Sequence, residues 1–269
     1  MLQSSIFEVT ILNNKLNILF TNLFNEFNSL LKECPLSKLE KINKQELPVD
    51  YFKFYKSVSS VYSSKIEGEN IDFDSYYKYK FLNVSFKPNY TKKADDLYNA
   101  YEFIEKTKLN LNNVKQAHTI LSANLLPKNK QGFIRTNPMF VINSEDLIDY
   151  VATNPKNVKS ELSKLFKDIK ILQDQKLTTV EVFYFASLIH LIFVKIHPFL
   201  DGNGRTARLI EKWFLIEKLG KKATSIPLEK NYFKYRNAYY NNLKKLGLEY
   251  EVLDYTKSLD FLLMTVKSL

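Results

Sequence analysis

The residues best suited to chemistry lie in one stretch, His197–Arg208, which reads His-Pro-Phe-Leu-Asp-Gly-Asn-Gly-Arg-Thr-Ala-Arg. Two of the six glycines and two of the four arginines of the 269-residue chain fall within seven residues here. Gly202 and Gly204 allow a tight turn and a close approach of the backbone to a ligand. Free N–H groups in such a loop, followed by a helix N-terminus, predict a site for phosphate oxygens.

Four side chains of this stretch complete a site for phosphoryl chemistry. Arg205 and Arg208 are three residues apart, so both can point from one helix face toward a bound anion. Asp201 would repel a phosphate unless Mg²⁺ lay between them, and Mg²⁺ commonly takes one carboxylate plus substrate phosphates. His197, with an ordinary pKa near ~6.5, can accept a hydroxyl proton at neutral pH. These residues predict phosphoryl or nucleotidyl transfer to a hydroxyl.

The flanking sequence predicts the elements that position this loop. The run Val180–Ile196 is apolar on nearly all sides, which predicts a central buried helix ending at the loop. A second helix is expected to begin near Gly204 and to end at Gly220. The segment Asn137–Ala152 alternates short apolar and polar stretches and predicts a β-hairpin.

Other segments follow the helical period, which makes the expected fold mainly α. A helix at about 51–67 would be closed by Gly68, and a second would be capped by Thr91. The segment Val158–Ile169 carries an amphipathic stripe. The stretches Cys34–Asp50 and Asn83–Tyr90 contain prolines and are interpreted as linkers.

Composition narrows the class of protein. Hydrophobic residues make up 45% of the chain and charged residues 25%, as in a soluble globular protein. A single cysteine excludes an internal disulfide and fits the cytoplasm. No membrane-spanning or signal segment is expected, because the apolar run Phe183–Val194 is short and contains His190. The net charge of +10 could indicate nucleic-acid binding, but lysines scattered along the chain favour a solvated surface instead.

The stretch His197–Arg208 resembles the signature of the Fic family, His-x-Phe-x-(Asp/Glu)-Gly-Asn-Gly-Arg-x-x-Arg, in full. The resemblance implies a Fic-type helical bundle with a small β-hairpin flap beside the active site. It divides the chain into an N-terminal helical region, residues 1–85, and a catalytic core with C-terminal helices, residues 86–269.

The resemblance also implies a reaction and a role for each motif residue. His197 would deprotonate a Ser, Thr or Tyr hydroxyl of a target protein, and Asp201 would hold Mg²⁺, with Mn²⁺ as the alternative. The backbone of Gly202, Asn203 and Gly204, with the Asn203 side chain, would bind the α- and β-phosphates of ATP. Arg205 would hold β-phosphate oxygens, and Arg208 would bind the γ-phosphate. Attack at the α-phosphate would leave AMP on the target and release pyrophosphate.

Gly204 bears on the choice of reaction. The Doc-like branch of the family, which phosphorylates its targets, has Lys at the position of Gly204. The glycine therefore favours AMP transfer.

A second motif, Ser63-Ser64-Lys65-Ile66-Glu67-Gly68, resembles the family's inhibitory element, (Ser/Thr)-x-x-x-Glu-(Gly/Asn). Ser63 and Glu67 are four residues apart and would share one helix face. The resemblance implies that Glu67 pairs with Arg208 and blocks the γ-phosphate site. A carboxylate and a phosphate cannot both occupy one guanidinium, so the resting enzyme is expected to be slow.

Two further correspondences concern the surroundings of the loop. The expected hairpin, with Phe140, Val141 and Ile142, lies where the family has a flap whose edge can pair with an extended target segment. Tyr240 resembles one of two tyrosines near the adenine pocket in relatives. His118 and His190 lie within helical patterns and are expected to be structural.

The leading hypothesis is an autoinhibited protein adenylyltransferase. The same residues also allow removal of AMP from modified targets with the help of Glu67, or a nucleotide-binding regulator with little turnover. The 17 tyrosines make self-modification an additional expectation, and the sequence leaves the oligomeric state open.

Overall fold

The computed structural model describes residues 15–31, 35–43, 50–87, 89–142 and 145–269, and Cys34, Pro48 and Pro88 lie outside these ranges. The helices are α2 (Phe24–Ser29), α3 (Pro35–Asn43), α4 (Tyr51–Ile66), α5 (Phe73–Leu82), α6 (Lys92–Ile104), α7 (Leu111–Leu121), α8 (Val158–Asp174), α9 (Thr179–Ile196), α10 (Asn203–Leu219), α11 (Leu228–Lys234), α12 (Arg236–Lys244) and α13 (Leu259–Val266). The strands are β1 (Phe140–Ile142) and β2 (Ile148–Val151). Short 3₁₀ turns are η1 (Lys128–Lys130), η2 (Lys221–Ser225), η3 (Tyr250–Val252) and η4 (Tyr255–Ser258). The mainly helical fold that the sequence predicts is confirmed.

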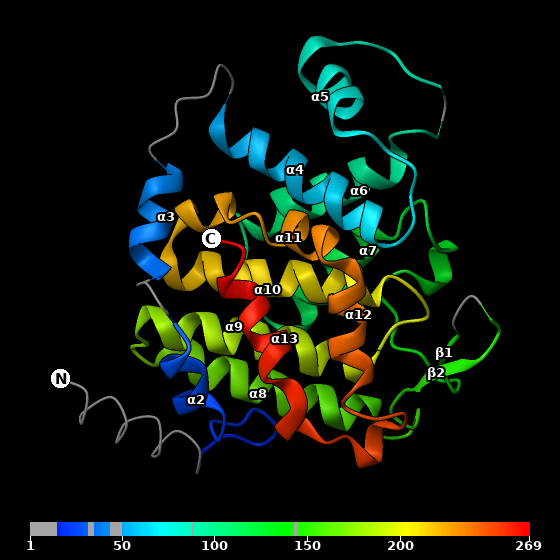
Figure 1. The fold of residues 1–269 in the computed structure, drawn as a ribbon. Coiled ribbons are helices and arrows are strands. Elements are labelled where there is room, and N and C mark those ends of the chain that lie inside the picture. Colours follow the sequence, from blue (N-terminus) through cyan, green and yellow to red (C-terminus); the bar gives the residue numbers. More distant parts are fainter. Residues whose placement is uncertain (1–14, 32–34, 44–49, 88, 143–144) are drawn as a thin grey trace.

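The centre of the fold is α9, which α8, α10 and α13 surround (Figure 1). It begins with a capping box, in which the Thr178 side chain and Glu181 each bond the other's backbone. By length and composition alone α9 could cross a membrane, but 83% of it is buried inside the protein, as in a core helix. Burial of α9 on all sides therefore fixes the position of His197, the residue that follows its last turn.

Helix α4 lies across the helical body and packs against α6, α10 and α11 (Figure 1). The side chain of Asp50 caps its first turn by accepting from the Lys53 N–H, and Gly68 follows its end with a φ of +87°. The helix expected at about 51–67 is confirmed. Its C-terminal end is the part that reaches the motif loop.

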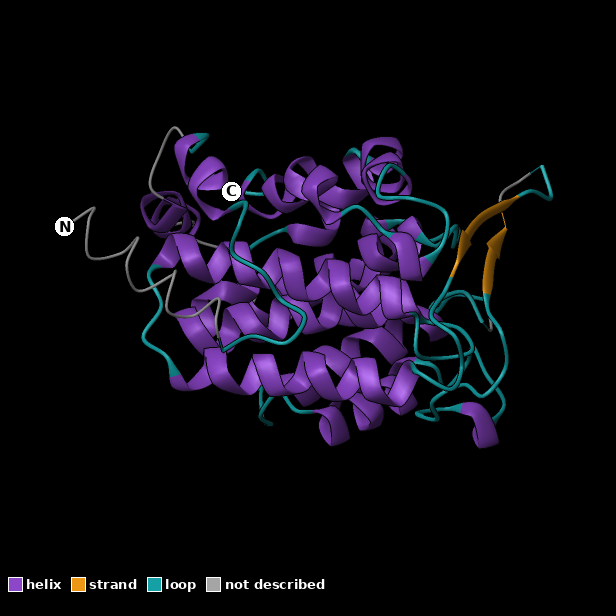
Figure 2. Ribbon diagram, turned by 90° about the horizontal axis from the view of Figure 1, so that it is seen from below, coloured by secondary structure: helices purple, strands orange, loops and turns teal. Residues whose placement is uncertain are grey.

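The expected hairpin is also present and projects from one end of the body (Figure 2). Antiparallel pairing joins Phe140 to Val151 and Val141 to Tyr150, and a register shift follows Val141. The interpretation of Cys34–Asp50 as a linker was wrong in part, because α3 occupies 35–43 and buries Leu39. Pro35 is the first residue of this helix, a position that suits proline because the N–H it lacks would have no intrahelical partner there. The domain boundary at residue 85 stays a prediction.

Candidate active site

The motif loop begins where α9 ends. His197 is the C-terminal cap of α9 and takes a left-handed conformation with a φ of +53°. The Asn203 side chain then closes the loop: its oxygen accepts from the Phe199 N–H at 2.8 Å and its nitrogen donates to the Phe199 carbonyl at 2.9 Å. The chain can therefore reverse within six residues and start α10 beside the end of α9.

This use of Asn203 differs from the expectation that its side chain binds phosphate. The residue is 2% exposed, and both ends of its amide are engaged by Phe199. The side chain thus shapes the loop, whereas the first N–H groups of α10 remain the groups suited to an anion, because they lack intrahelical acceptors.

His197 is held as a hydrogen-bond acceptor facing the site. Its Nδ1 lies 3.2 Å from the Val194 carbonyl oxygen, which can only accept, so Nδ1 carries the proton and Nε2 is left free to accept one. Burial lowers the pKa of His197 to about 4, so the imidazole is neutral at physiological pH. A neutral imidazole whose Nε2 can accept a proton could act as a general base.

The residues expected to hold phosphates and a metal gather at the start of α10. Asp201 is exposed, and its Oδ1 accepts from the Gly202 N–H at 2.6 Å. Within the described part of the chain, the buried Nε of Arg205 has no hydrogen-bond partner. The unpartnered guanidinium N–H is suited to a phosphate oxygen. The exposed Asp201 carboxylate fits Mg²⁺ shared with phosphate oxygens, since that ion takes few protein ligands.

Arg208 is fully buried and is engaged by the end of α4. Its Nη2 donates to the Glu67 Oε1 at 2.6 Å, and its Nε donates to the Ser63 hydroxyl at 3.0 Å. Burial raises the pKa of Glu67, but Arg208 and Arg205 outweigh it, and the pKa lies below its ordinary value. The predicted contact of Glu67 with Arg208 is present, and Ser63, on the same helix face, contacts Arg208 as well.

A second carboxylate, which sequence reasoning missed, occupies Arg205. The Oε1 of Glu69 accepts from the Arg205 Nη2 at 3.3 Å and from the Lys93 Nζ at 2.6 Å. Both motif arginines therefore face carboxylates from the same turn of chain after α4. The sequence did offer one indication of this contact, an acidic residue two positions beyond Glu67.

Gly204 makes room for this arrangement. A Cβ placed on residue 204 would lie 2.5 Å from the Glu67 Oε1 and 3.2 Å from the Arg208 Nη1. Any larger side chain at this position would have to displace the Glu67 carboxylate. The glycine thus permits the Glu67–Arg208 ion pair as well as the approach of a ligand.

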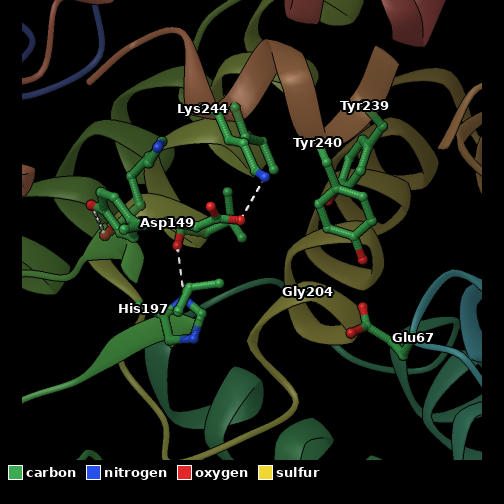
Figure 3. Close-up of a pocket in the computed structure, with 12 residues that line it drawn as sticks. Glu67, Asp149, His197, Gly204, Tyr239, Tyr240 and Lys244 are labelled. Atoms are coloured by element: carbon green, nitrogen blue, oxygen red, sulfur yellow. Dashed lines mark hydrogen bonds and ion pairs between the residues drawn. The ribbon is translucent and has the colours of Figure 1, made fainter. Parts of the chain in front are cut away.

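A pocket opens between the motif loop, the flap and α12 (Figure 3). Tyr240 lines it and donates from its hydroxyl to the Ile66 carbonyl at 3.2 Å, so it contacts the end of α4 as well. An ion pair of 2.5 Å between Lys244 and Asp149 joins α12 to the flap. Glu67 and His197 line the same pocket.

The flap places its apolar residues toward solvent. The exposed fractions of Phe140, Val141 and Ile142 are 46%, 36% and 59%. Within the described residues, β1 pairs only with β2, so its other edge is not covered by a strand. This edge is suited to pairing with an extended segment of another chain.

His118 is structural, as the sequence predicts, and the part that it supports is the motif loop. Its Nδ1 accepts from the Gly132 N–H at 2.8 Å, so its Nε2 carries the proton and donates to the Asp201 carbonyl at 2.9 Å. Its ring stacks on Phe199 with centroids 3.7 Å apart. A buried histidine on α7 thus holds the motif loop from 83 residues away.

Replacing Gly132 should therefore destabilise the protein. Gly132 has a φ of +75°, and a Cβ there would lie 2.3 Å from the Thr119 Oγ1 and 2.7 Å from the Lys115 carbonyl oxygen. We expect Gly132→Ala to lower the free energy of unfolding by about 1–3 kcal/mol. Gly220→Ala is the matched control, because Gly220 has a φ of +81° but no atom within 4 Å of the added Cβ. If urea unfolding gave the same decrease in the free energy of unfolding for Gly132→Ala and Gly220→Ala, the predicted clash would be contradicted.

Comparison with known families agrees with the resemblance that the motif loop carries. The Fic/DOC family model matches residues 108–215, which include the whole motif loop. Residues 108–215 of the chain therefore match the Fic/DOC family, and the motif loop lies within the matched segment.

Named relatives are protein adenylyltransferases. The chain is 26% identical over 142 residues to protein adenylyltransferase fic-1 of Caenorhabditis elegans, covering 53% of this chain and 26% of the relative. It is 38% identical over 73 residues to protein adenylyltransferase Fic of Drosophila yakuba, covering 27% of this chain and 14% of the relative. The chain thus spans about a quarter or less of these curated relatives.

Solved structures share the fold. A Fic family protein from Desulfovibrio desulfuricans G20 superposes with a TM-score of 0.72 at 16% identity, over 94% of this chain and 73% of that one. A Fic domain containing signaling protein from Bacteroides thetaiotaomicron VPI-5482 gives a TM-score of 0.64 at 18% identity, over 92% of each chain. At sequence identities this low, the similarity to these structures shows a shared fold and nothing further.

Proposed function

We propose that this chain is a protein adenylyltransferase, which moves AMP from ATP to a hydroxyl group of a target protein. The observation that carries the proposal is the placement of His197, a neutral imidazole with an unprotonated Nε2, in one pocket with the start of α10. The named relatives support AMP as the transferred group.

The geometry supports a single displacement. Nε2 of His197 takes the proton of the target hydroxyl as its oxygen attacks the α-phosphorus of ATP. A new P–O bond forms, the α–β bridging P–O bond breaks, and its electron pair leaves on pyrophosphate. Arg205, Arg208 and the N–H groups of α10 stabilise the phosphate charge. Mg²⁺, held by Asp201 and phosphate oxygens, would neutralise part of that charge.

The target is proposed to dock on the flap. An extended segment that adds to the open edge of β1 would meet Phe140, Val141 and Ile142 with its side chains and place a Ser, Thr or Tyr near His197.

The position of the label in ATP tests the reaction. In the Glu67→Gly variant with Mg²⁺ and a cell extract as target source, ATP labelled at the α-phosphate should leave label fixed to protein. ATP labelled at the γ-phosphate should leave none. The reverse pattern would identify a kinase and overturn the proposal.

The resting enzyme is proposed to be autoinhibited. Glu67 occupies Arg208, and Glu69 occupies Arg205, so the two guanidinium groups best placed for the β- and γ-phosphates already carry carboxylate partners. ATP would then bind with its α-phosphate poorly aligned for attack.

A second candidate activity is the removal of AMP from modified targets. It is favoured by one observation, the Glu67 carboxylate facing the same pocket as His197, where it could orient water. A time course with AMP-modified target separates the two activities: wild type would lose label from the target, and Glu67→Gly would not.

The pH dependence follows from the environment of His197. Because burial lowers its pKa to about 4, the base should stay unprotonated from pH 8 to about 5, and the rate of AMP transfer should not fall with an inflection near the ordinary value of ~6.5. The unfolded chain binds the proton at higher pH than the folded chain. Stability should therefore decrease as the pH falls from about 6.5 toward about 4. A pH–rate profile of Glu67→Gly with an inflection near 6.5 would contradict this assignment.

A further inference from the structure

Arg135 lies just before the flap and holds the end of α9. Its Nε donates to the His197 carbonyl at 2.7 Å, and its Nη2 lies 3.4 Å from the Ile196 carbonyl. Its backbone N–H donates to the Pro198 carbonyl at 2.9 Å. The last carbonyls of a helix lack intrahelical donors and carry partial negative charge, so a guanidinium is a favourable partner.

The same guanidinium holds both roots of the flap. Its Nη1 donates to the carbonyl of Asn137, which precedes β1, at 2.8 Å. Its Nη2 donates to the carbonyl of Thr153, which follows β2, at 2.5 Å. Arg135 is 6% exposed, so these bonds are shielded from water.

One rigid group therefore connects two parts of the site that come from distant segments. A guanidinium is planar and presents its donors in fixed directions, so the carbonyls that it binds are held at fixed relative positions. His197 needs such support, because it follows the last turn of α9 in a left-handed conformation with a φ of +53°. A shift of its backbone would move Nε2 directly.

We propose that Arg135 is a positioning residue, which fixes the imidazole of His197 relative to the flap so that a docked hydroxyl meets the base at one place. The proposal rests on the proposed function, since it assumes a target on the flap and a base at His197. A misplacement of about 1 Å can cost about 10²-fold in rate.

Arg135→Lys is the informative variant. It keeps the charge but offers one nitrogen in place of three, so it cannot hold both α9 and the flap roots. In the Glu67→Gly background, with α-labelled ATP and a cell extract as target source, we expect the rate at saturating ATP to fall roughly 10- to 100-fold. The Kd for ATP, measured by calorimetry, should stay within about twofold, because no phosphate-site residue changes.

Controls separate positioning from a loss of fold. Arg236→Met removes an exposed arginine on α12 and should leave rate, Kd and Tm at the parent values. Arg135→Met removes all the side-chain hydrogen bonds of Arg135, and the Tm of this variant shows whether the protein still folds. An Arg135→Lys variant as fast as the parent would overturn the proposal. So would a slower variant whose rate and ATP binding fall together in proportion to unfolded protein.

A second readout does not depend on catalysis. The chain has three histidines, so ¹⁵N-histidine NMR resolves each ring. In Arg135→Lys the signals of His197 should move from a single Nδ1–H tautomer toward a mixture, whereas those of His118 and His190 should not move. If Glu67→Gly transfers no AMP, the proposed function fails, and unchanged His197 signals in Arg135→Lys would separately overturn the positioning role.

Discussion

Glu67→Gly should raise AMP transfer roughly ten- to hundredfold, because a hydrogen bond to a charged group contributes about 1.5–3 kcal/mol and each 1.4 kcal/mol corresponds to about tenfold. The variant removes the 2.6 Å contact with Arg208 and leaves that guanidinium for the γ-phosphate. Label fixed to protein from α-labelled ATP, as an initial rate, measures the effect. Equal rates for wild type and Glu67→Gly would contradict autoinhibition.

The same substitution should lower stability in a way that ATP reverses. Arg208 is fully buried, so the loss of Glu67 leaves its positive charge without a carboxylate partner. The hydrogen bond to the uncharged Ser63 hydroxyl remains, but it is a weaker interaction. We expect the Tm of Glu67→Gly to fall without ATP and to rise more than that of wild type when ATP and Mg²⁺ are added. Glu69→Gln should have a smaller effect on rate than Glu67→Gly, since the Arg205 contact is longer at 3.3 Å and Glu69 also binds Lys93.

Removal of the base should have the second large effect. His197→Ala in the Glu67→Gly background should lose roughly 10²–10⁴-fold in rate, the range that general bases contribute. Because His197 has a φ of +53°, His197→Asn is the matched variant, since Asn tolerates this conformation better than Ala. Both should bind ATP like the parent. Retained transfer by His197→Asn would show that another group accepts the proton.

Local signals in the sequence were sufficient for the elements and for the motif. The apolar run Val180–Ile196 indicated a helix buried on all sides, and Gly220 marked the end of α10. The i, i+4 spacing of Ser63 and Glu67 placed both on one face of α4, and both contact Arg208. These features depend on neighbours within one or two turns, which a single sequence records directly.

Contacts between residues far apart in the sequence could not be predicted in this way. Arg135 binds the carbonyl of His197, 62 positions away, and His118 binds that of Asp201, 83 positions away. Backbone carbonyls carry no residue identity, so no pairing of side-chain types indicated either contact. The resemblance assigned the Asn203 side chain to phosphate, whereas in the structure this side chain binds the backbone of Phe199.

One measurement tests the central claim most directly: the covalent transfer of label from α-labelled ATP, with Mg²⁺, by wild type, Glu67→Gly and Glu67→Gly/His197→Ala. The account predicts little label for wild type, strong label for Glu67→Gly and a return to background in the double variant. Strong label in the double variant, or none in Glu67→Gly despite measurable ATP binding, would contradict an adenylyltransferase with His197 as its base and Glu67 as its inhibitor.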